Sequence, residues 1–272
     1  MQIIYAILLG LVQGLTEFLP VSSSGHLVLF QHFFQKSSTG NDISLEIFLH
    51  FGTLLAVIVF FRNDIMDLIA SLFHWNKTLD YQKHSRNRMI IVYLVISTFC
   101  TGIIYVLFGK RIETVFAKPL FVAIMLSITG VIVFLSDLVK KTEIPLSGMG
   151  MMRSIIIGLG QGIAMLPGIS RSGTTIATAL YCGVKRADAA RFSFLLSIPA
   201  ILAANMSEVK VISGLQGNML ISYILGALAA FVSGYLVIGV LLRLIRACKL
   251  KYFAFYCWFI SVLSITLILY HL

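Results

Sequence analysis

The chain has 272 residues, of which 58% are hydrophobic and only 12% are charged, and its formal net charge is +10. Soluble globular domains carry about 25% charged residues, so this composition excludes an ordinary soluble protein. The basic residues lie in short loops between apolar segments, which is typical of membrane orientation rather than of nucleic-acid binding. We therefore expect an all-α polytopic membrane protein with one integral membrane domain over residues 1–272.

The chain opens with an uncharged apolar segment, residues 1–16, which leads into a polar motif. Gly10 and Gly14 are four residues apart, so one helix face is able to pack closely on a neighbour. Glu17 follows, Pro20 interrupts the helix, and a run of serines precedes a second short apolar arm. Each arm is shorter than the roughly 20 residues of a full span. Such an elbow is tolerated at membrane depth where protein or a wet cavity covers it, so the sequence predicts a re-entrant helical hairpin.

Residues 154–184 repeat this pattern of short arm, elbow and short arm. Six other apolar segments are predicted to cross the membrane: residues 43–61, 89–109, 119–136, 192–207, 211–242 and 252–272. The polar loop after the first of them, residues 62–88, is expected to begin with an interfacial helix. The chain thus divides into halves of about 1–140 and 150–272, each with one hairpin and three crossings.

Short sequence matches support an internal repeat. Gly10-Leu-Val-Gln-Gly14 matches Gly158-Leu-Gly-Gln-Gly162, an offset of 148, and Ser22-Ser-Ser-Gly25 matches Ser170-Arg-Ser-Gly173 at the same offset. Because three crossings are an odd number, the second half is predicted to be inverted in the membrane relative to the first. The two elbows are then able to meet near the midplane, where inverted-repeat folds commonly place ligand sites.

The distribution of basic residues tests this layout. With the first residue placed outside, the four predicted cytoplasmic loops hold 15 of the 21 Lys and Arg residues. The outside segments hold five, and Arg171 lies within the second hairpin. Cytoplasmic loops are the ones that carry an excess of Lys and Arg, so this bias predicts that both termini lie outside.

Glu17 and Arg171 are isolated charges at membrane depth, where a charge costs from about 3 to more than 10 kcal/mol. They must be paired, or hydrated by a cavity, and a purely structural ion pair is one alternative. The elbows around them are rich in hydroxyl groups and helix N-termini, which favour an anion. The hydroxyls belong to Ser22, Ser23, Ser24, Ser170, Ser172, Thr174 and Thr175. Arg171 adds a planar donor that suits phosphate oxygens.

Single members of these motifs also have structural alternatives. Helix capping is a common role for an elbow serine, and we expect it most for Ser24 and Ser172. His26 is expected to orient or deprotonate a serine hydroxyl, although a lone histidine on an apolar face is more often a hydrogen-bonded core residue. Gln13 lies one helical turn before Glu17 on the same face, and a helix-packing hydrogen bond is its alternative role.

Glu17 is also predicted to handle protons, because burial favours the neutral acid whereas a nearby arginine favours the carboxylate. Glu46 and His50 share one face of the first predicted crossing. We expect them to line the cavity or to support the residues around Glu17. The remaining histidines are expected at the surface or at the membrane interface.

The two elbows together carry two extended motifs. The first is a (Glu/Gln)-x-x-x-Glu pattern that starts at Gln13 and runs through Glu-Phe-Leu-Pro-Val-Ser-Ser-Ser-Gly-His, and the second is Pro-Gly-x-Ser-Arg-Ser-Gly-x-Thr from Pro167 to Thr175. With the segments 45–52 and 191–199, they resemble the bacterial undecaprenyl-pyrophosphate phosphatase family of the bacitracin-resistance type. The resemblance covers nearly the whole chain in order.

This resemblance implies an integral membrane phosphatase of the bacterial cytoplasmic membrane, acting on its outer side. It would hydrolyse undecaprenyl diphosphate to undecaprenyl phosphate and inorganic phosphate, which recycles the lipid carrier for peptidoglycan and confers bacitracin resistance. The motif match assigns catalytic roles to Glu17, Ser23, His26 and Arg171. It assigns substrate binding to Gln13, Ser22, Ser170, Ser172, Gly173 and Thr175.

Ser23 is the candidate nucleophile, activated by His26 or Glu17, and attack by an activated water is the alternative. Mg²⁺ or Ca²⁺ is expected to bridge substrate oxygens with little protein ligation, Glu17 being the one candidate ligand, and no organic cofactor is expected. Gln13 stands where some family members carry a second glutamate, which disfavours a carboxylate pair that holds a metal. Membrane lipid surrounds the chain, and a homodimer is left open.

A competing class is an isoprenoid-phosphate flippase or an anion transporter, because inverted repeats with broken helices are also a transporter architecture. A flippase needs charge recognition but no nucleophile, so Ser23 and His26 favour the enzyme. A structural scaffold is a more distant alternative, since it does not require buried Glu17 and Arg171.

Overall fold

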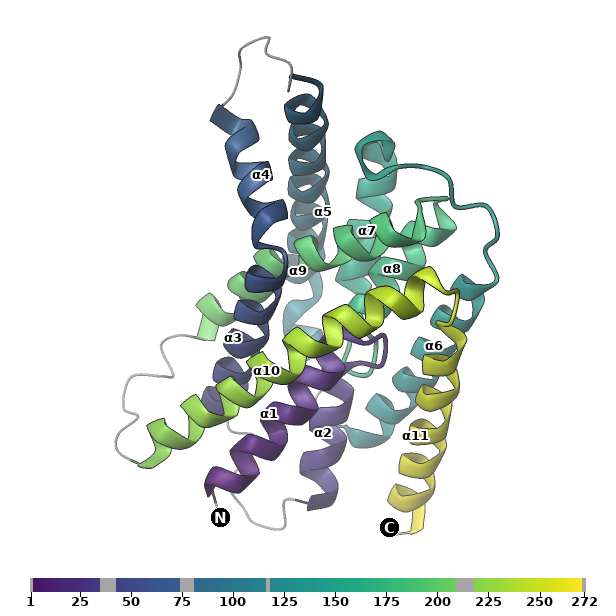
Figure 1. The fold of residues 1–272 in the computed structure, drawn as a ribbon. Coiled ribbons are helices and arrows are strands. Elements are labelled where there is room, and N and C mark those ends of the chain that lie inside the picture. The colour runs from purple at the N-terminus through teal and green to yellow at the C-terminus, as the bar shows by residue number, and fades with distance from the viewer. Residues whose placement is uncertain (1, 35–42, 74–80, 116–117, 209–217, 271–272) are drawn as a thin grey trace.

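The computed structural model describes residues 2–34, 43–73, 81–115, 118–208 and 218–270. Within these ranges the chain is helical, and its β-structure is limited to one isolated bridge (Figure 1). The first half contains α1 (Gln2–Phe18), α2 (Ser23–Phe34), α3 (Ile43–Phe60), α4 (Arg62–Phe73), α5 (Tyr81–Glu113) and α6 (Pro119–Asp137). The second contains a 3₁₀ turn, η1 (Leu146–Gly148), then α7 (Met151–Ile163), α8 (Arg171–Tyr181), α9 (Arg186–Glu208), α10 (Asn218–Arg246) and α11 (Lys251–Tyr270).

Five of these helices, α5, α6, α9, α10 and α11, are long and apolar enough to cross a membrane. A sixth span is formed if α3 and α4 are counted together, although the chain bends by 73° between them. The prediction of a polytopic all-α membrane protein is therefore confirmed. The expected helix at the start of the 62–88 loop is α4, and the first residues of the predicted 211–242 segment lie outside the described ranges.

Two short apolar helices, α1 and α7, are each followed by a turn and a second short helix. We call residues 19–22 elbow 1 and residues 164–170 elbow 2. Both elbows contain a proline and one residue with positive φ, Ser22 at 68° and Gly168 at 93°. Serine rarely adopts this left-handed conformation, whereas glycine does so readily. In each half, an elbow thus separates two short helices that pack on each other.

Glycines allow α1 and α7 to lie close against long helices of the opposite half. A methyl group at Gly10 or Gly14 would overlap α10, and one at Gly158 or Gly162 would overlap α5. The close packing predicted for Gly10 and Gly14 is confirmed. The last helices of the two halves, α6 and α11, also pair along their lengths, with a 2.8 Å hydrogen bond from Ser127 Oγ across the pair.

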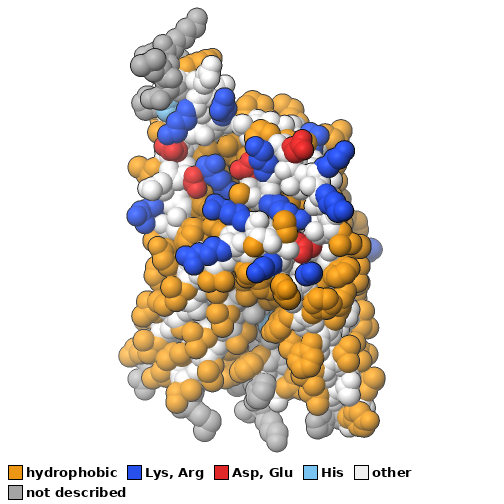
Figure 2. Space-filling model, turned by 45° about the vertical axis from the view of Figure 1, so that its right-hand side comes forward, with side chains coloured by type: hydrophobic (Ala, Val, Ile, Leu, Met, Phe, Trp, Pro, Cys, Tyr) orange, Lys and Arg blue, Asp and Glu red, His pale blue; other side chains and the backbone are white. Residues whose placement is uncertain are grey.

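Basic residues gather on the upper part of one face of the molecule. The start of α1 and the end of α11 lie at the lower end in Figure 1, and α4 and the start of α5 reach the upper end. Figure 2 shows Lys and Arg side chains in the upper part of the visible face and mainly hydrophobic side chains below them. Two partly buried ion pairs lie between helices, Arg186 with Asp137 at 3.1 Å and Arg191 with Asp64 at 2.5 Å.

Candidate active site

Glu17 is the centre of the candidate site, and its side chain is only 6% exposed. Its Oε2 accepts hydrogen bonds from Gln13 Nε2 at 2.9 Å and from Ser23 Oγ at 2.5 Å. Its Oε1 accepts one from Arg171 Nη2 at 2.5 Å. The predicted meeting of the two isolated charges is confirmed, and it joins the end of α1 to the start of α8 although 154 positions separate the residues.

Local structure explains these positions. Gln13 and Glu17 are one turn apart on α1, Ser23 is the first residue of α2, and Arg171 is the first residue of α8. The N-termini of α2 and α8 therefore both lie at the site. The first amides of a helix have no intrahelical acceptor, and the helix dipole makes this end positive, so both ends favour an anion.

The serines that cap these helices are not the expected ones. Ser22 Oγ accepts the Gly25 N–H at 3.2 Å, and Ser170 Oγ accepts the Gly173 N–H at 3.1 Å. The expectation that Ser24 and Ser172 are the caps is wrong, because α2 and α8 begin one residue after Ser22 and Ser170. Ser172 instead donates to the carbonyl oxygen of elbow 1 at residue 19, at 2.9 Å, and so ties the two hairpins together.

Elbow 2 is also fixed from α6. Thr129 Oγ1 donates to the Gly168 carbonyl at 2.8 Å and accepts the Ser170 N–H at 2.9 Å. This threonine was not identified from the sequence, because a single hydroxyl in an apolar span does not indicate which neighbour it faces. It holds the residue before Arg171 and thereby helps to place the guanidinium.

Thr175 and Gly173 were expected to bind substrate, and in the structure both contact other protein groups. Thr175 Oγ1 donates to the Arg171 carbonyl at 2.8 Å and is 2.6 Å from Ser193 Oγ. Gly173 is packed against Pro20, and its N–H is taken by the cap. Gln13 differs from these residues, because its buried Oε1 has no hydrogen-bond partner among the described residues.

His26 lies beside the site, with both ring nitrogens engaged. Nδ1 is 2.8 Å from the Ser22 carbonyl oxygen, so it donates, and Nε2 is 2.9 Å from the Tyr256 hydroxyl, from which it accepts. The two rings also stack, with centroids 5.5 Å apart. In this arrangement the carboxylate of Glu17, rather than His26, contacts the Ser23 hydroxyl.

His50 approaches Glu17 from α3. Its Nε2 is 4.0 Å from Glu17 Oε2, and its Nδ1 is 2.9 Å from the Glu46 carbonyl oxygen. The Glu46 carboxylate accepts a hydrogen bond from Gln31 Nε2 at 3.1 Å. Of the two residues expected to support the site, His50 approaches Glu17, whereas the carboxylate of Glu46 contacts Gln31.

The side chains around Glu17 do not supply enough ligands to hold a resident metal ion. No group of three His, Cys, Asp or Glu side chains converges anywhere in the described ranges. Both oxygens of Glu17 already accept hydrogen bonds, and the unpartnered Gln13 Oε1 is the one buried oxygen beside it without a donor. An ion at this site would take most of its ligands from bound oxygens of a substrate and from water.

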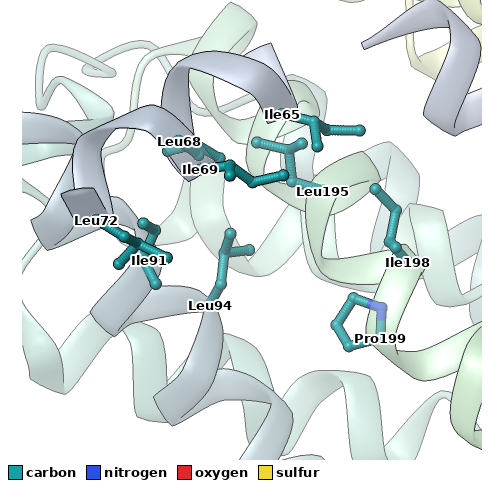
Figure 3. A pocket seen from close by; sticks show the side chains of 9 residues that line it. All are labelled: Ile65, Leu68, Ile69, Leu72, Ile91, Leu94, Leu195, Ile198 and Pro199. Atoms are coloured by element: carbon teal, nitrogen blue, oxygen red, sulfur yellow. The ribbon is translucent and has the colours of Figure 1, made fainter. Parts of the chain in front are cut away.

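An apolar pocket of about 240 Å³ lies apart from these residues, between α4, α5 and α9 (Figure 3). Its lining shares no residue with the site around Glu17. It is lined by Ile65, Leu68, Ile69, Leu72, Ile91, Leu94, Leu195, Ile198 and Pro199.

The fold and the site define a multi-pass membrane protein with a buried hydroxyl, carboxylate and guanidinium centre between two helix N-termini. Such a centre suits nucleophilic chemistry on an anionic group. The chain belongs to the bacitracin resistance protein BacA family, whose family model matches residues 6–263.

Named relatives match the chain over almost its full length. A protein named undecaprenyl-diphosphatase from Methanobrevibacter smithii is 42% identical, over 97% of this chain and 96% of the relative. One of the same name from Halothermothrix orenii is 39% identical, over 98% of both chains. Undecaprenyl-diphosphatase 1 from Shouchella clausii is 39% identical, over 97% of this chain and 95% of the relative.

Proposed function

We propose that this protein hydrolyses undecaprenyl diphosphate to undecaprenyl phosphate and inorganic phosphate. The observation that carries the proposal is the contact of the Ser23 hydroxyl with Glu17, whose other oxygen is held by Arg171. The names of the relatives support the same activity. The reaction recycles the lipid carrier of cell-envelope polymers, and removal of the diphosphate form accounts for the bacitracin resistance in the family name.

Each side chain has a role that follows from its position. Arg171 and the N-termini of α2 and α8 bind the terminal phosphate. Ser23 Oγ attacks the terminal phosphorus while its proton passes to Glu17 Oε2, and the bond from that phosphorus to the bridging oxygen breaks to release undecaprenyl phosphate. Water then attacks the phosphoserine, the Oγ–P bond breaks, and Ser23 regains a proton. Phosphoryl transfer depends mainly on positioning and charge stabilisation, which these groups supply.

The alternative chemistry keeps the same residues and omits the phosphoserine. In it, Glu17 removes a proton from a water that attacks the terminal phosphorus, and Ser23 orients the phosphate. His26 acts as a positioning residue in either case, because it links the Ser22 carbonyl of elbow 1 to Tyr256 of α11. It thereby supports the backbone immediately before Ser23.

A divalent cation, Mg²⁺ or Ca²⁺, is proposed to enter with the diphosphate and to neutralise part of its charge. Diphosphate oxygens and water suit both ions, and Mg²⁺ in particular keeps several of its waters. Both oxygens of Glu17 already accept hydrogen bonds from protein groups, so the ion would take its ligands from the diphosphate and from water. No step above depends on the ion.

The membrane arrangement that we propose has two re-entrant hairpins, α1–α2 and α7–α8, in an inverted repeat. It is supported by the short lengths of these helices and by the contact between elbow 1 and the start of α8. It is also supported by the exchange of partners between halves, since α1 packs on α10 and α7 on α5. Irregular backbone and charge are then covered by protein near the midplane.

The orientation that we propose places both termini and the entrance to Glu17 outside the cytoplasmic membrane. The 15-to-5 bias of Lys and Arg supports it, and their gathering on the upper part of one face of the molecule agrees (Figure 2). An impermeant thiol reagent tests this in intact cells with single-cysteine variants on a cysteine-free background. A cysteine at Lys110 should react and one at Lys249 should not. The reverse pattern contradicts the orientation.

Glu17→Ala and Arg171→Ala test the assignment of the site. The purified chain in detergent should release phosphate from undecaprenyl diphosphate without any gradient, and both variants should lose this activity while they keep their fold. Arg246→Ala is the control, because Arg246 is exposed in the last turn of α10. Normal turnover in either site variant contradicts the proposal, and substrate movement without phosphate release from well-folded wild type favours a flippase.

A further inference from the structure

His50 holds a defined tautomer that directs a proton acceptor toward Glu17. A carbonyl oxygen is only an acceptor, so the 2.9 Å contact between His50 Nδ1 and the Glu46 carbonyl requires a proton on Nδ1. In the neutral ring, Nε2 is then unprotonated, and it is the atom that lies 4.0 Å from Glu17 Oε2. This distance is about 1 Å longer than a hydrogen bond, so a small side-chain rotation or one water closes it.

The proton that Glu17 receives from Ser23 must pass on to another group that is able to accept it. A protonated Glu17 leaves Arg171 beside a neutral acid, in a site where the arginine side chain is only 17% exposed. Removal of one partner of a buried ion pair is strongly unfavourable. Among the other groups that contact Glu17 in the described ranges, the Gln13 amide does not accept a proton, and the guanidinium is always protonated.

We propose that His50 is the proton relay of this site. The proposal rests on the proposed function. When Ser23 attacks, its proton passes to Glu17 Oε2 and then to His50 Nε2, which gives an imidazolium beside a carboxylate that still pairs with Arg171. During hydrolysis of the phosphoserine, water gives one proton to the same pair and Ser23 Oγ takes one back. The proton left over in the net reaction leaves from His50.

The exposed fractions of the two side chains support proton transfer from Glu17 to His50 and then out of the site. The His50 side chain is 30% exposed, whereas that of Glu17 is 6% exposed. Around α3, the charged or titratable groups with contacts among the described residues include Glu46 on the same helix and Arg62 of α4, which donates to the Val59 carbonyl. Two tyrosines of α10 also pack on α3, Tyr223 on Phe48 and Tyr235 on Phe60. The Asp64–Arg191 ion pair joins α4 to α9. Of the acids and bases in the described ranges, Glu17 is the one placed within 4.0 Å of the imidazole Nε2.

Gln13 provides a way to test the relay by rescue. Its amide nitrogen is 2.9 Å from the same Glu17 oxygen. A glutamate at position 13 would place a second carboxyl group there, and two carboxyl groups so close share a proton. The variant Gln13→Glu therefore supplies a titratable partner for Glu17 from α1 instead of α3.

The experiment measures kcat, KM and the pH dependence of phosphate release for wild type, His50→Gln and His50→Gln/Gln13→Glu. His32→Gln is the matched control, since His32 is an exposed histidine on α2. Glutamine at position 50 keeps a hydrogen-bonding side chain but does not carry a proton. We expect kcat to fall by about tenfold or more, toward the lower range of general acid–base effects, with KM changed by less than about twofold.

Two further readouts separate a relay from a structural role. The pH dependence of kcat should differ between wild type and His50→Gln, because glutamine does not carry a proton. The double variant should recover kcat with an optimum at lower pH than wild type. A His50→Gln enzyme with the kcat and pH profile of wild type overturns the relay. So does an equal loss in the double variant, which indicates a packing defect.

A nuclear magnetic resonance measurement, which does not require turnover, tests the relay independently of the proposed function. Spectra of ¹⁵N-labelled imidazoles in detergent micelles should show His50 as the Nδ1-protonated tautomer at neutral pH. Its Nε2 resonance should respond to Glu17→Gln, whereas that of His32 should not. An Nε2-protonated tautomer, or no response to Glu17→Gln, overturns the relay even if the enzyme is active. If wild type releases no phosphate, the proposed function fails, and the spectra alone decide whether Glu17 and His50 share a proton.

Discussion

A double-mutant cycle on Glu17 and Arg171 separates the structural value of their ion pair from its catalytic value. In Arg171→Met, the Glu17 carboxylate stays buried at 6% exposure with only Gln13 and Ser23 as donors. Breaking a buried pair by removing one partner costs about 3–5 kcal/mol. We expect about 3 kcal/mol here, the lower end, because two neutral donors remain.

Glu17→Gln leaves Arg171 without its anion and should cost a similar amount. The double variant Glu17→Gln/Arg171→Met removes both charges, so its stability should return to within about 1 kcal/mol of wild type, because replacement of a whole buried pair is often neutral. With about 3 kcal/mol lost in each single variant and at most about 1 kcal/mol lost in the double variant, the coupling energy is about 5 kcal/mol. This exceeds the 0.5–3 kcal/mol that is usual for residues in contact. Turnover should remain lost in all three variants.

The assay is reversible unfolding in mixed detergent, followed by helix content, beside phosphate release from the same preparations. Additive destabilisation in the double variant would refute the reasoning, since it would show that the two charges do not compensate each other. Recovery of turnover together with stability would also refute it, because the pair would then be structural only.

Three other substitutions test the supports of the site. Gly14→Val should destabilise the protein by about 1–3 kcal/mol or more, because the added side chain overlaps α10, and thermal unfolding in detergent measures it. Thr129→Val removes the hydroxyl that binds two backbone groups of elbow 2, so we expect a loss of about 1–3 kcal/mol together with lower kcat. Tyr256→Phe leaves His26 Nε2 without its donor, and because this hydrogen bond is exposed we expect about 0.5–1.5 kcal/mol of destabilisation with only a modest change in turnover.

For each of these three substitutions, one experimental result would contradict the expectation. Wild-type stability of the Gly14 variant would mean that α1 and α10 separate without cost. Unchanged kcat in the Thr129 variant would show that elbow 2 does not place Arg171. A complete loss of turnover in the Tyr256 variant would give His26 a direct chemical role in place of a positioning one.

The centre of the site could be predicted from the sequence because buried charge imposes a strong physical demand. Glu17 and Arg171 are isolated in apolar surroundings, and each needs a partner, so their pairing follows once the two halves are recognised as similar. The Gly10 and Gly14 face could be predicted for a related reason, since small residues four apart permit close approach of helices.

Other parts of the site could not be predicted, because the sequence does not say what a lone polar group faces. Thr129 and Tyr256 lie in apolar spans, and the contact from Tyr256 to His26 joins residues 230 positions apart. The choice of capping serines depended on where α2 and α8 begin, and a shift of one or two residues moves the cap from one serine to the next. The approach of His50 to Glu17 likewise depends on how α3 packs against α1.

Phosphate release by wild type and Ser23→Ala, measured side by side in detergent with and without EDTA, tests the central claim most directly. Our account predicts that wild type releases phosphate from undecaprenyl diphosphate and that Ser23→Ala loses this activity. It also predicts that EDTA lowers turnover, because EDTA removes the divalent ion that enters with the diphosphate. Release by Ser23→Ala at the wild-type rate would contradict the assignment of Ser23 as nucleophile. No release from well-folded wild type would contradict the phosphatase itself.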